Sequence, residues 1–251
     1  MAIMHEMANW IPAPGGINLP PDEVHVWMAR LDQPEAIVAD HRTILSTDER
    51  ARADRFHFEK DRTAYTVARA ALKSLLGRYL GVGATAIQFQ YSSHGKPYLE
   101  QSANIGGLSF NISHSHKLAL LAFAVGRQVG VDVERIRADF ATLEIAERFF
   151  SKSEVAALLA QPAEQQADCF FNCWTRKEAY IKAIGEGLSC PLHRFDVTLG
   201  PNEPARLLAT RVDSQDASQW SMHNLDVGPG YKAAVIAEGT DWRLKCWLWS
   251  G

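Results

Sequence analysis

The spacing of hydrophobic and polar positions along the chain indicates strands in some segments and helices in others. Residues 23–31 alternate between apolar and polar side chains, as a half-buried strand does. After Asp61, apolar side chains recur at threes and fours until Gly81, which predicts a long helix with a glycine stop. A second long helix is predicted over residues 165–184, before Gly185. Strands are predicted near residues 87–91, 108–112, 118–125 and 129–134, with four or five more from residue 194 onward, and turns at 95–97 and 113–116.

The two halves of the chain repeat the same signals at an offset of 104 or 105 residues. Each half contains a Val-x-Val strand, a Ser-x-x-Glu capping box and a glycine pair that follows a helix. Their positions are 24–26 and 129–131, 46–49 and 151–154, and 80–83 and 184–187. We therefore predict an α+β fold of two similar α/β halves, residues 23–127 and 128–251, related by a pseudo-twofold axis. Residues 1–22 would form an N-terminal arm, and a ligand site is expected in the cleft between the halves.

Composition excludes several classes of protein. The 251 residues include 26 Lys and Arg against 29 Asp and Glu, which is not the basic balance of a protein that coats nucleic acid. No charge-free stretch approaches the ~20 apolar residues of a membrane span. The N-terminus lacks the basic leader and apolar segment of a signal peptide. The four scattered cysteines are typical of core thiols. We expect a cytoplasmic globular protein with no nucleic-acid or membrane partner.

Candidate chemistry begins in the predicted strand over residues 129–134. Side chains alternate along a strand, so Asp132 and Glu134 share one face, about 7 Å apart, while the valines share the other. A hard divalent cation such as Mg²⁺ would remove the repulsion between these carboxylates. A solvent-facing edge strand, with Arg135 and Arg137 as surface partners, explains the same pattern.

Two further segments carry groups that suit a phosphate. Glu178 and Lys182 are four residues apart on one face of the second long helix, where they form either an exposed ion pair or part of a metal–phosphate site. Ser113 and His114 lie where a strand runs into a polar turn. They would bind a phosphate or satisfy backbone groups at the strand end.

Taken together and in this order, these segments resemble the 4′-phosphopantetheinyl transferases of the long, two-half type. The shared motifs span about residues 45–200. They are Gly95-Lys96-Pro97, Phe110-Asn-Ile-Ser113-His114-Ser115, Gly130-Val-Asp132-Val-Glu134 and Trp174-Thr-Arg-Lys177-Glu178-Ala-Tyr-Ile-Lys182, together with Arg55-Phe56 and Arg148-Phe149-Phe150-Ser151. The Asp-x-Glu strand followed by Trp-x-x-Lys-Glu-x-x-x-Lys is the most specific pair. The family's fold is also two pseudo-twofold α+β halves.

The resemblance implies an enzyme that transfers 4′-phosphopantetheine from coenzyme A to a serine of an acyl, peptidyl or polyketide carrier protein and releases 3′,5′-ADP. It implies Mg²⁺, with Mn²⁺ as an alternative, bound by Asp132, Glu134 and Glu178. Lys182 would contact a phosphate, and Glu178 would take the proton of the attacking serine, directly or through water. The implied catalytic residues are thus Asp132, Glu178 and Lys182.

The resemblance assigns only part of the contacts to coenzyme A. Lys96, Ser113, His114 and Lys182 match family residues that hold it. Members often carry basic residues in the first short helix to bind the 3′-phosphate, but Glu49 stands at one of those positions here. The substitutes are Arg52, Arg55 and Arg69.

The resemblance also implies a carrier-protein contact on residues 140–159, which contain Phe149, Phe150, Lys152 and Leu158. A core position for at least one of Phe149 and Phe150 is the alternative. A cleft formed within one chain favours a monomer. Two other functions fit the same residues: a coenzyme A or nucleotide-binding module without catalysis, and a metal-dependent phosphohydrolase acting on a small substrate.

Overall fold

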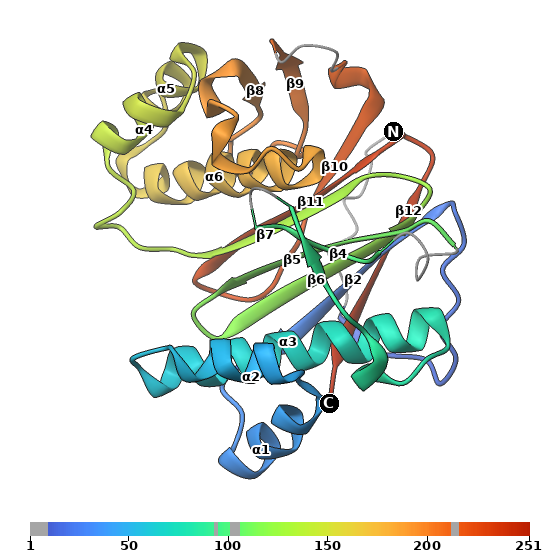
Figure 1. The fold of residues 1–251 in the computed structure, drawn as a ribbon. Helices are drawn as coiled ribbons and strands as arrows, with labels where there is room; N and C mark the ends of the chain where they lie inside the picture. Colours follow the sequence, from blue (N-terminus) through green and yellow to red (C-terminus); the bar gives the residue numbers. More distant parts are fainter. Residues whose placement is uncertain (1–9, 93–94, 101–105, 212–215) are drawn as a thin grey trace.

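Two sheets lie between two layers of helices in the computed structural model, which describes residues 10–92, 95–100, 106–211 and 216–251 (Figure 1). The first sheet has the strand order β1-β12-β2-β6-β5, and the second has the order β10-β11-β7. The first consists of β1 (Ile11–Pro12), β12 (Arg243–Trp249), β2 (Glu23–Arg30), β6 (Leu118–Val125) and β5 (Leu108–Ser115). The second consists of β10 (Trp220–Asn224), β11 (Tyr231–Glu238) and β7 (Val129–Arg135).

A group of helices covers the outer side of each sheet (Figure 1). Those of the first sheet are α1 (Glu35–Ile44), α2 (Thr47–Asp54) and α3 (Glu59–Leu80). Those of the second are α4 (Leu143–Phe149), α5 (Lys152–Leu159) and α6 (Ala163–Ile184). Two short hairpins complete the described chain, β3 (Gln90–Tyr91) with β4 (Pro97–Tyr98) and β8 (Phe195–Val197) with β9 (Leu207–Thr210). Single 3₁₀ turns lie at Ala84–Ala86, Gly187–Ser189, Leu192–Arg194 and Ala217–Gln219.

The predicted pseudo-twofold is confirmed by the topology. Strands β2-β6-β5 and β7-β11-β10 pair in the same order and are antiparallel throughout. Helices α3 and α6 each have 22 residues and end at a left-handed glycine, Gly81 or Gly185. Both capping boxes form, at Ser46 and Ser151, with the hydroxyl accepting from the glutamate amide and the glutamate accepting in return.

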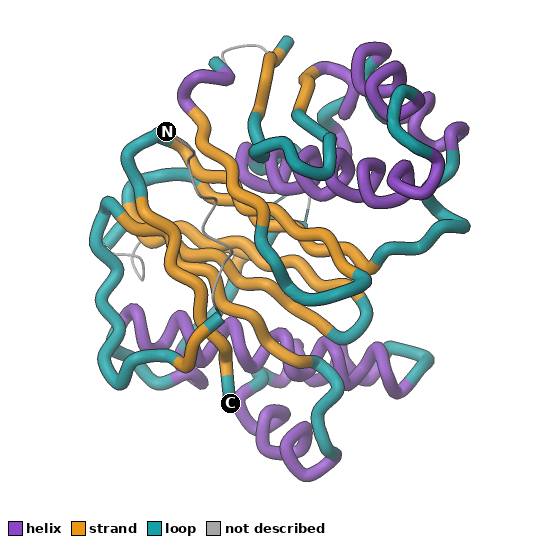
Figure 2. The backbone as a smooth tube through the Cα atoms, turned by 180° about the vertical axis from the view of Figure 1, so that it is seen from behind, coloured by secondary structure: helices purple, strands orange, loops and turns teal. Residues whose placement is uncertain are grey.

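Both ends of the described chain join the first sheet (Figure 2). Strand β12, which belongs to the predicted second half of the chain, pairs in parallel with β2. On its other side β12 pairs with β1, so part of the predicted arm is a short edge strand. The sheet of the first half therefore depends on a strand from the far end of the sequence.

Two expected local features differ, and a third is confirmed. The turn predicted at 113–116 is wrong, because β5 stays paired with β6 up to Ser115 and the chain turns at His116, which has φ 54°. Only Gln90–Tyr91 of the strand expected at 87–91 forms. The turn at 95–97 is centred on Gly95, with φ 77°, and ends at Pro97, where β4 begins.

The core has three layers, one between α3 and the first sheet, one between the two sheets and one between α6 and the second sheet. All four cysteines are buried and free, as predicted. None of the helices in the described ranges is both long and apolar enough to cross a bilayer.

Candidate functional site

The two halves meet where β5 lies beside β7. Alternate side chains of β5 point toward β7 and form hydrogen bonds with it. The bonds run from Val131 N to Asn111 Oδ1 (3.0 Å), from Ser113 Oγ to Asp132 Oδ1 (2.7 Å) and from Ser115 Oγ to Glu134 Oε2 (2.8 Å). This ladder fixes both predicted strand carboxylates at the junction of the halves.

Gly130 lets α6 approach β7 closely. A Cβ atom at this position would lie 2.0 Å from the carbonyl oxygen of Ala179 and 2.6 Å from the amide nitrogen of Ala183. No side chain fits there, so the Gly-x-Asp spacing has a steric cause. The close approach brings Glu178 and Lys182 of α6 to the strand that carries Asp132.

Asp132 is the centre of the site. Its carboxylate is 2 % exposed, and Lys182 Nζ lies 2.6 Å from Oδ1. The same ammonium donates to Ser113 Oγ at 2.9 Å, so the three side chains form a closed triangle. The other carboxylate oxygen of Asp132, Oδ2, is buried and has no hydrogen-bond partner among the described residues. A buried carboxylate oxygen without a partner is costly unless a ligand completes it.

The neighbouring carboxylates are short of compensating charge. Burial, followed by the charges of Asp132 and Glu134, raises the pKa of Glu178 to about 7. Burial and Asp132 also raise the pKa of Glu134, against the opposing effects of Ser115 and Lys182. One ammonium therefore serves three acids, and a divalent cation bound there would relieve the remaining repulsion.

Within the described ranges, no three His, Cys, Asp or Glu side chains are already gathered as a metal-binding group. In this structure the Lys182 ammonium forms an ion pair with the Asp132 carboxylate. The donor set still suits a hard cation, because its atoms are carboxylate oxygens and one of them, Asp132 Oδ2, is buried and unpaired.

A cavity of about 260 Å³ opens beside these residues. It lies between the Gly95-Lys96-Pro97 turn and the end of α6, and Glu178 and Lys182 line it with Asn111. Lys96 forms one wall. Its Nζ donates to the carbonyl oxygen of Lys182 at 2.6 Å, which caps the C-terminal end of α6, and burial lowers the pKa of Lys96.

The structure separates two residues that are adjacent in the sequence. Ser113 points toward Asp132, whereas the next residue, His114, lies on the opposite face of β5 and is exposed. Desolvation of its ring lowers the pKa of His114, as does the nearby Lys182 ammonium. The exposed His114 ring is therefore neutral more readily than a free histidine.

The predicted arginines are only partly brought together. Arg69 is 8 % exposed, and its guanidinium carbon lies 4.7 Å from the Phe89 ring centroid and 5.6 Å from that of Tyr65. Arg52 reaches the same Tyr65 ring from outside, at 5.6 Å, and both arginines lie about 6 Å from Tyr91. Arg69 Nη1 is buried and, within the part of the chain that is described, lacks a hydrogen-bond partner. The rings of Tyr65, Phe89 and Tyr91 form an aromatic cluster around the two arginines, and no signal in the sequence marks these rings as part of a binding site.

Glu49 is buried for structural reasons. It closes the capping box of α2 and lies 3.0 Å from Lys73 Nζ and 3.8 Å from Arg69 Nε. This position therefore holds an acid that pairs with α3, while Arg55 is exposed at the C-terminal cap of α2.

Two residues of the expected carrier-contact segment lie in the core. Phe150 is 3 % exposed and packs against Phe170, and Leu158 is 5 % exposed. The core alternative therefore holds for Phe150, and the prediction that Leu158 belongs to a contact surface is wrong, because both side chains pack in the core beside α6. Phe149 is half-buried and Lys152 is exposed.

The equivalent positions of the first half carry no acidic site. Arg78 and Trp27 take the places of Lys182 and Asp132 under the pseudo-twofold, and Arg78 lies over the Trp27 ring at 5.5 Å. Ser74 replaces Glu178, and Ala29 replaces Glu134. The fold is repeated, but the acidic cluster occurs in one half only.

Fold and site define a two-half α+β protein with an acidic, lysine-bearing centre at the junction of its halves. Residues 32–125 match the family model described as 4′-phosphopantetheinyl transferase, N-terminal, and residues 128–236 match that of the 4′-phosphopantetheinyl transferase superfamily. The chain belongs to the 4′-phosphopantetheinyl transferase superfamily.

Similar proteins cover nearly the whole chain. The 4′-phosphopantetheinyl transferase HetI of Nostoc sp. is 42 % identical over 239 residues, which are 95 % of this chain and 98 % of that protein. The 4′-phosphopantetheinyl transferase Sfp of Bacillus subtilis is 33 % identical over 79 % of this chain and 84 % of its own. A Bacillus anthracis holo-(acyl-carrier-protein) synthase, solved in complex with CoA (3′,5′-ADP), aligns with 45 % of this chain and 96 % of its own at a TM-score of 0.36 and 16 % identity.

Proposed function

We propose that this chain transfers the 4′-phosphopantetheine group of coenzyme A to a serine hydroxyl of an apo carrier protein in a Mg²⁺-dependent reaction that releases 3′,5′-ADP. The observation that carries the proposal is the convergence of Asp132, Glu178 and Lys182 beside a cavity at the junction of the two halves. Family membership supports the reaction, and this geometry supports the residues.

Asp132, Glu134 and Glu178 would hold the cation, with Mn²⁺ as an alternative. When bound, the ion would neutralise pyrophosphate oxygens and strengthen the electrophilic character of the phosphorus. The unpaired Asp132 Oδ2 and the raised pKa values of both glutamates support this assignment.

The phosphates of coenzyme A would contact the cationic side chains around the cavity. Lys182 is placed to bind a pyrophosphate oxygen, because its Nζ already lies at the acidic centre. Lys96 lines the same cavity. His114 would be the further phosphate contact, since its ring interacts electrostatically with Lys182. Ser113 would hold Asp132 and Lys182 in their relative orientation through its two hydrogen bonds.

In the transfer step the serine oxygen attacks the β-phosphorus. A new P–O bond forms while the bond between the β-phosphorus and the bridging oxygen breaks, so that 3′,5′-ADP leaves with the bonding electrons. Glu178 accepts the serine proton. The protein's contribution is otherwise orientation and charge neutralisation, as phosphoryl transfer requires.

The 3′-phosphate would be bound by Arg52 and Arg69, with Arg55 as the exposed neighbour. Both guanidinium groups lie on the aromatic cluster that includes Tyr65, and Arg69 Nη1 is free to donate. The carrier protein would dock on the exposed part of residues 140–159, which includes Leu143, Lys152 and Leu159. We propose that the chain acts as a monomer, since both halves of the cleft come from one chain.

The test is intact-mass spectrometry of apo carrier proteins incubated with this chain, coenzyme A and Mg²⁺. The expected result is a mass increase of the carrier equal to one phosphopantetheine group. This increase should be absent when the reaction contains EDTA. E178Q should reduce this gain severely. Coenzyme A binding without transfer to any of several carriers would instead indicate a binding module. Release of 3′,5′-ADP without a carrier would indicate a phosphohydrolase.

A further inference from the structure

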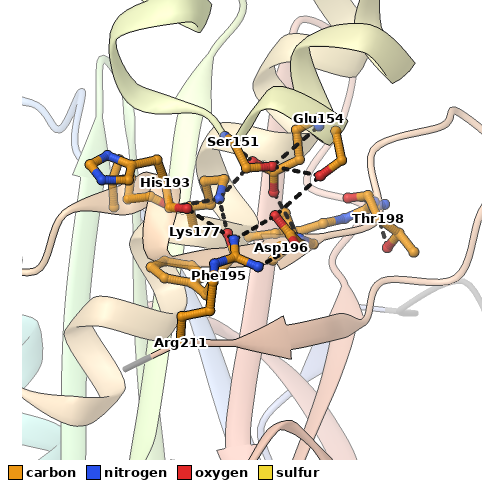
Figure 3. A network of polar contacts seen from close by, with 12 residues as sticks. Ser151, Glu154, Lys177, His193, Phe195, Asp196, Thr198 and Arg211 are labelled. Carbon is orange, nitrogen blue, oxygen red and sulfur yellow. Dashed lines mark hydrogen bonds and ion pairs between the residues drawn. The ribbon is translucent and has the colours of Figure 1, made fainter. Parts of the chain in front are cut away.

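The residue before Glu178 is one of the most deeply buried charges in the molecule. Lys177 is fully buried, and its Nζ lies 2.7 Å from Glu154 Oε2. The ammonium also donates to the carbonyl oxygens of Leu192 (2.8 Å) and Phe195 (2.5 Å), so all three of its protons have an acceptor (Figure 3). Lys177 takes no part in the proposed chemistry, and it is too deeply buried for its charge to be stabilised by solvent.

Its partner is equally constrained. Glu154 is 3 % exposed and accepts hydrogen bonds from Ser151 N and Val197 N, both at 2.8 Å. The pair therefore ties the start of α5, the middle of α6 and strand β8 into one unit, which Figure 3 shows around Lys177. We call these two residues, Glu154 and Lys177, the α6 anchor.

The α6 anchor lies on the side of the helix away from the first half. Successive residues of a helix project about 100° apart, so fixing Lys177 also fixes the direction of Glu178. On the other side, Gly130 admits the backbone of α6 against β7 at Ala179. The helix is thus held from both sides at the turn that carries Glu178, and it can neither rotate nor slide without breaking one of these contacts.

The first half contains a matched version of this pair. Lys73 is 1 % exposed, and its Nζ lies 3.0 Å from Glu49 Oε2, which closes the first capping box. The position after Lys73 is Ser74, which is not acidic. The same type of buried ion pair therefore occurs with and without an adjacent carboxylate of the site.

We propose that Lys177 is a positioning residue: held by Glu154, it sets the orientation of α6 that presents the Glu178 carboxylate to Asp132 and to the reacting phosphate. The inference rests on the proposed function, since it concerns the geometry of that site. A displacement of about 1 Å at a reacting group can lower a rate about 100-fold, so a small change in helix orientation is enough to be measured.

The test compares K177M with K73M, because each removes one buried ammonium from the same type of pair. Both should lower the unfolding temperature, and assays are run below both transitions. K177M should lower kcat at least about tenfold with little change in KM for coenzyme A. It should also weaken the binding of Mn²⁺ alone, measured by electron paramagnetic resonance on the protein without substrate. K73M should leave kcat and Mn²⁺ affinity at wild-type values.

A second pair of variants keeps the proposal falsifiable if K177M does not fold. E154Q preserves the size of the partner but removes its charge, and it should lower kcat and Mn²⁺ affinity in the same direction. K177R, which keeps the positive charge, should have a higher kcat and a higher Mn²⁺ affinity than K177M. The proposal is overturned if K177M or E154Q matches K73M in kcat and Mn²⁺ affinity. Failure of the proposed function looks different, because the wild-type chain would then transfer nothing.

Discussion

The two carboxylate oxygens of Asp132 have different surroundings. One oxygen is bound by Lys182 and Ser113, while the other is buried without a partner among the described residues. A side chain held this firmly on one oxygen and left open on the other is placed to bind a ligand rather than to stabilise the fold. The residue scale therefore predicts a large effect on transfer and a small one on folding.

We expect D132A to lower carrier-protein modification by at least about 100-fold, because it removes one of the proposed metal ligands and the partner of Lys182. Far-UV circular dichroism should stay unchanged. D168A is a suitable control, since Asp168 is a half-exposed carboxylate on α6, the helix that carries Lys182, and it is paired with Lys232. Its rate should stay within about twofold of wild type, as an exposed ion pair contributes little. Wild-type turnover in D132A would remove the metal assignment.

Glu178 should make stability depend on pH in metal-free protein. Its pKa is about 7 in the folded chain, well above the usual value of 4.5, so the folded state binds more protons than the unfolded state between these values. Stability is therefore lost as the pH rises through this window. In EDTA, E178Q should exceed wild type by roughly 1–3 kcal/mol at pH 8 and match it near pH 4, as measured by urea unfolding. A constant difference at both pH values would contradict the raised pKa.

At the scale of elements, the contact between β7 and α6 decides whether the site forms. It depends on a glycine, because the carbonyl oxygen of Ala179 occupies the place of a Cβ at Gly130. Lys96 closes the same helix at its C-terminal end by donating to the carbonyl oxygen of Lys182. Packing from one half and a cap from the other thus place Glu178 and Lys182 together.

We expect G130A to destabilise the chain by about 1–3 kcal/mol and to lower kcat, because the added methyl group pushes α6 away from Asp132. G83A is the matched control. Gly83 has φ −63°, and a Cβ there would meet only Thr85 Oγ1, at 3.9 Å. This variant should be neutral or more stable by about 0.4–1 kcal/mol. Urea unfolding and steady-state kinetics of both variants provide the comparison, and equal behaviour would contradict the steric account.

At the scale of the whole molecule, the two halves are less independent than their repeat suggests. Strand β12 lies between β1 and β2 in the first sheet, although in sequence it lies at the far end of the second half. Its Trp247 contacts the rings of Trp27 and His25 in β2, at 4.9 and 4.3 Å between centroids. The first half cannot complete its sheet without the end of the chain.

Deletion of residues 241–251 should therefore abolish cooperative unfolding or cost more than about 4 kcal/mol, since it exposes the edge of β2 and removes buried aromatic contacts. Deletion of residues 250–251 alone removes no part of β12 and should leave thermal unfolding by circular dichroism near wild type. A stable, cooperatively unfolding chain after the longer deletion would show that β12 is dispensable.

Much of the fold and part of the site follow from local sequence. The two long helices, both capping boxes and the strand carrying Asp132 and Glu134 were predictable, because periodicity and capping depend on residues a few positions apart. The repeat was visible for the same reason, since equal local signals recur at one offset.

The tertiary structure decided which of these signals meet. Glu49, Phe150 and Leu158 could be surface residues by local pattern, yet all three are buried because helices from distant segments cover them. Likewise the place of β12 depends on pairing with a strand more than 200 residues earlier. Contact between Lys182 and Asp132 needs the close approach at Gly130, and the buried Lys177 looks like any helical lysine until β8 is placed around it. Local chemistry selects the elements, whereas only packing between them determines which carboxylates lie together with Lys182.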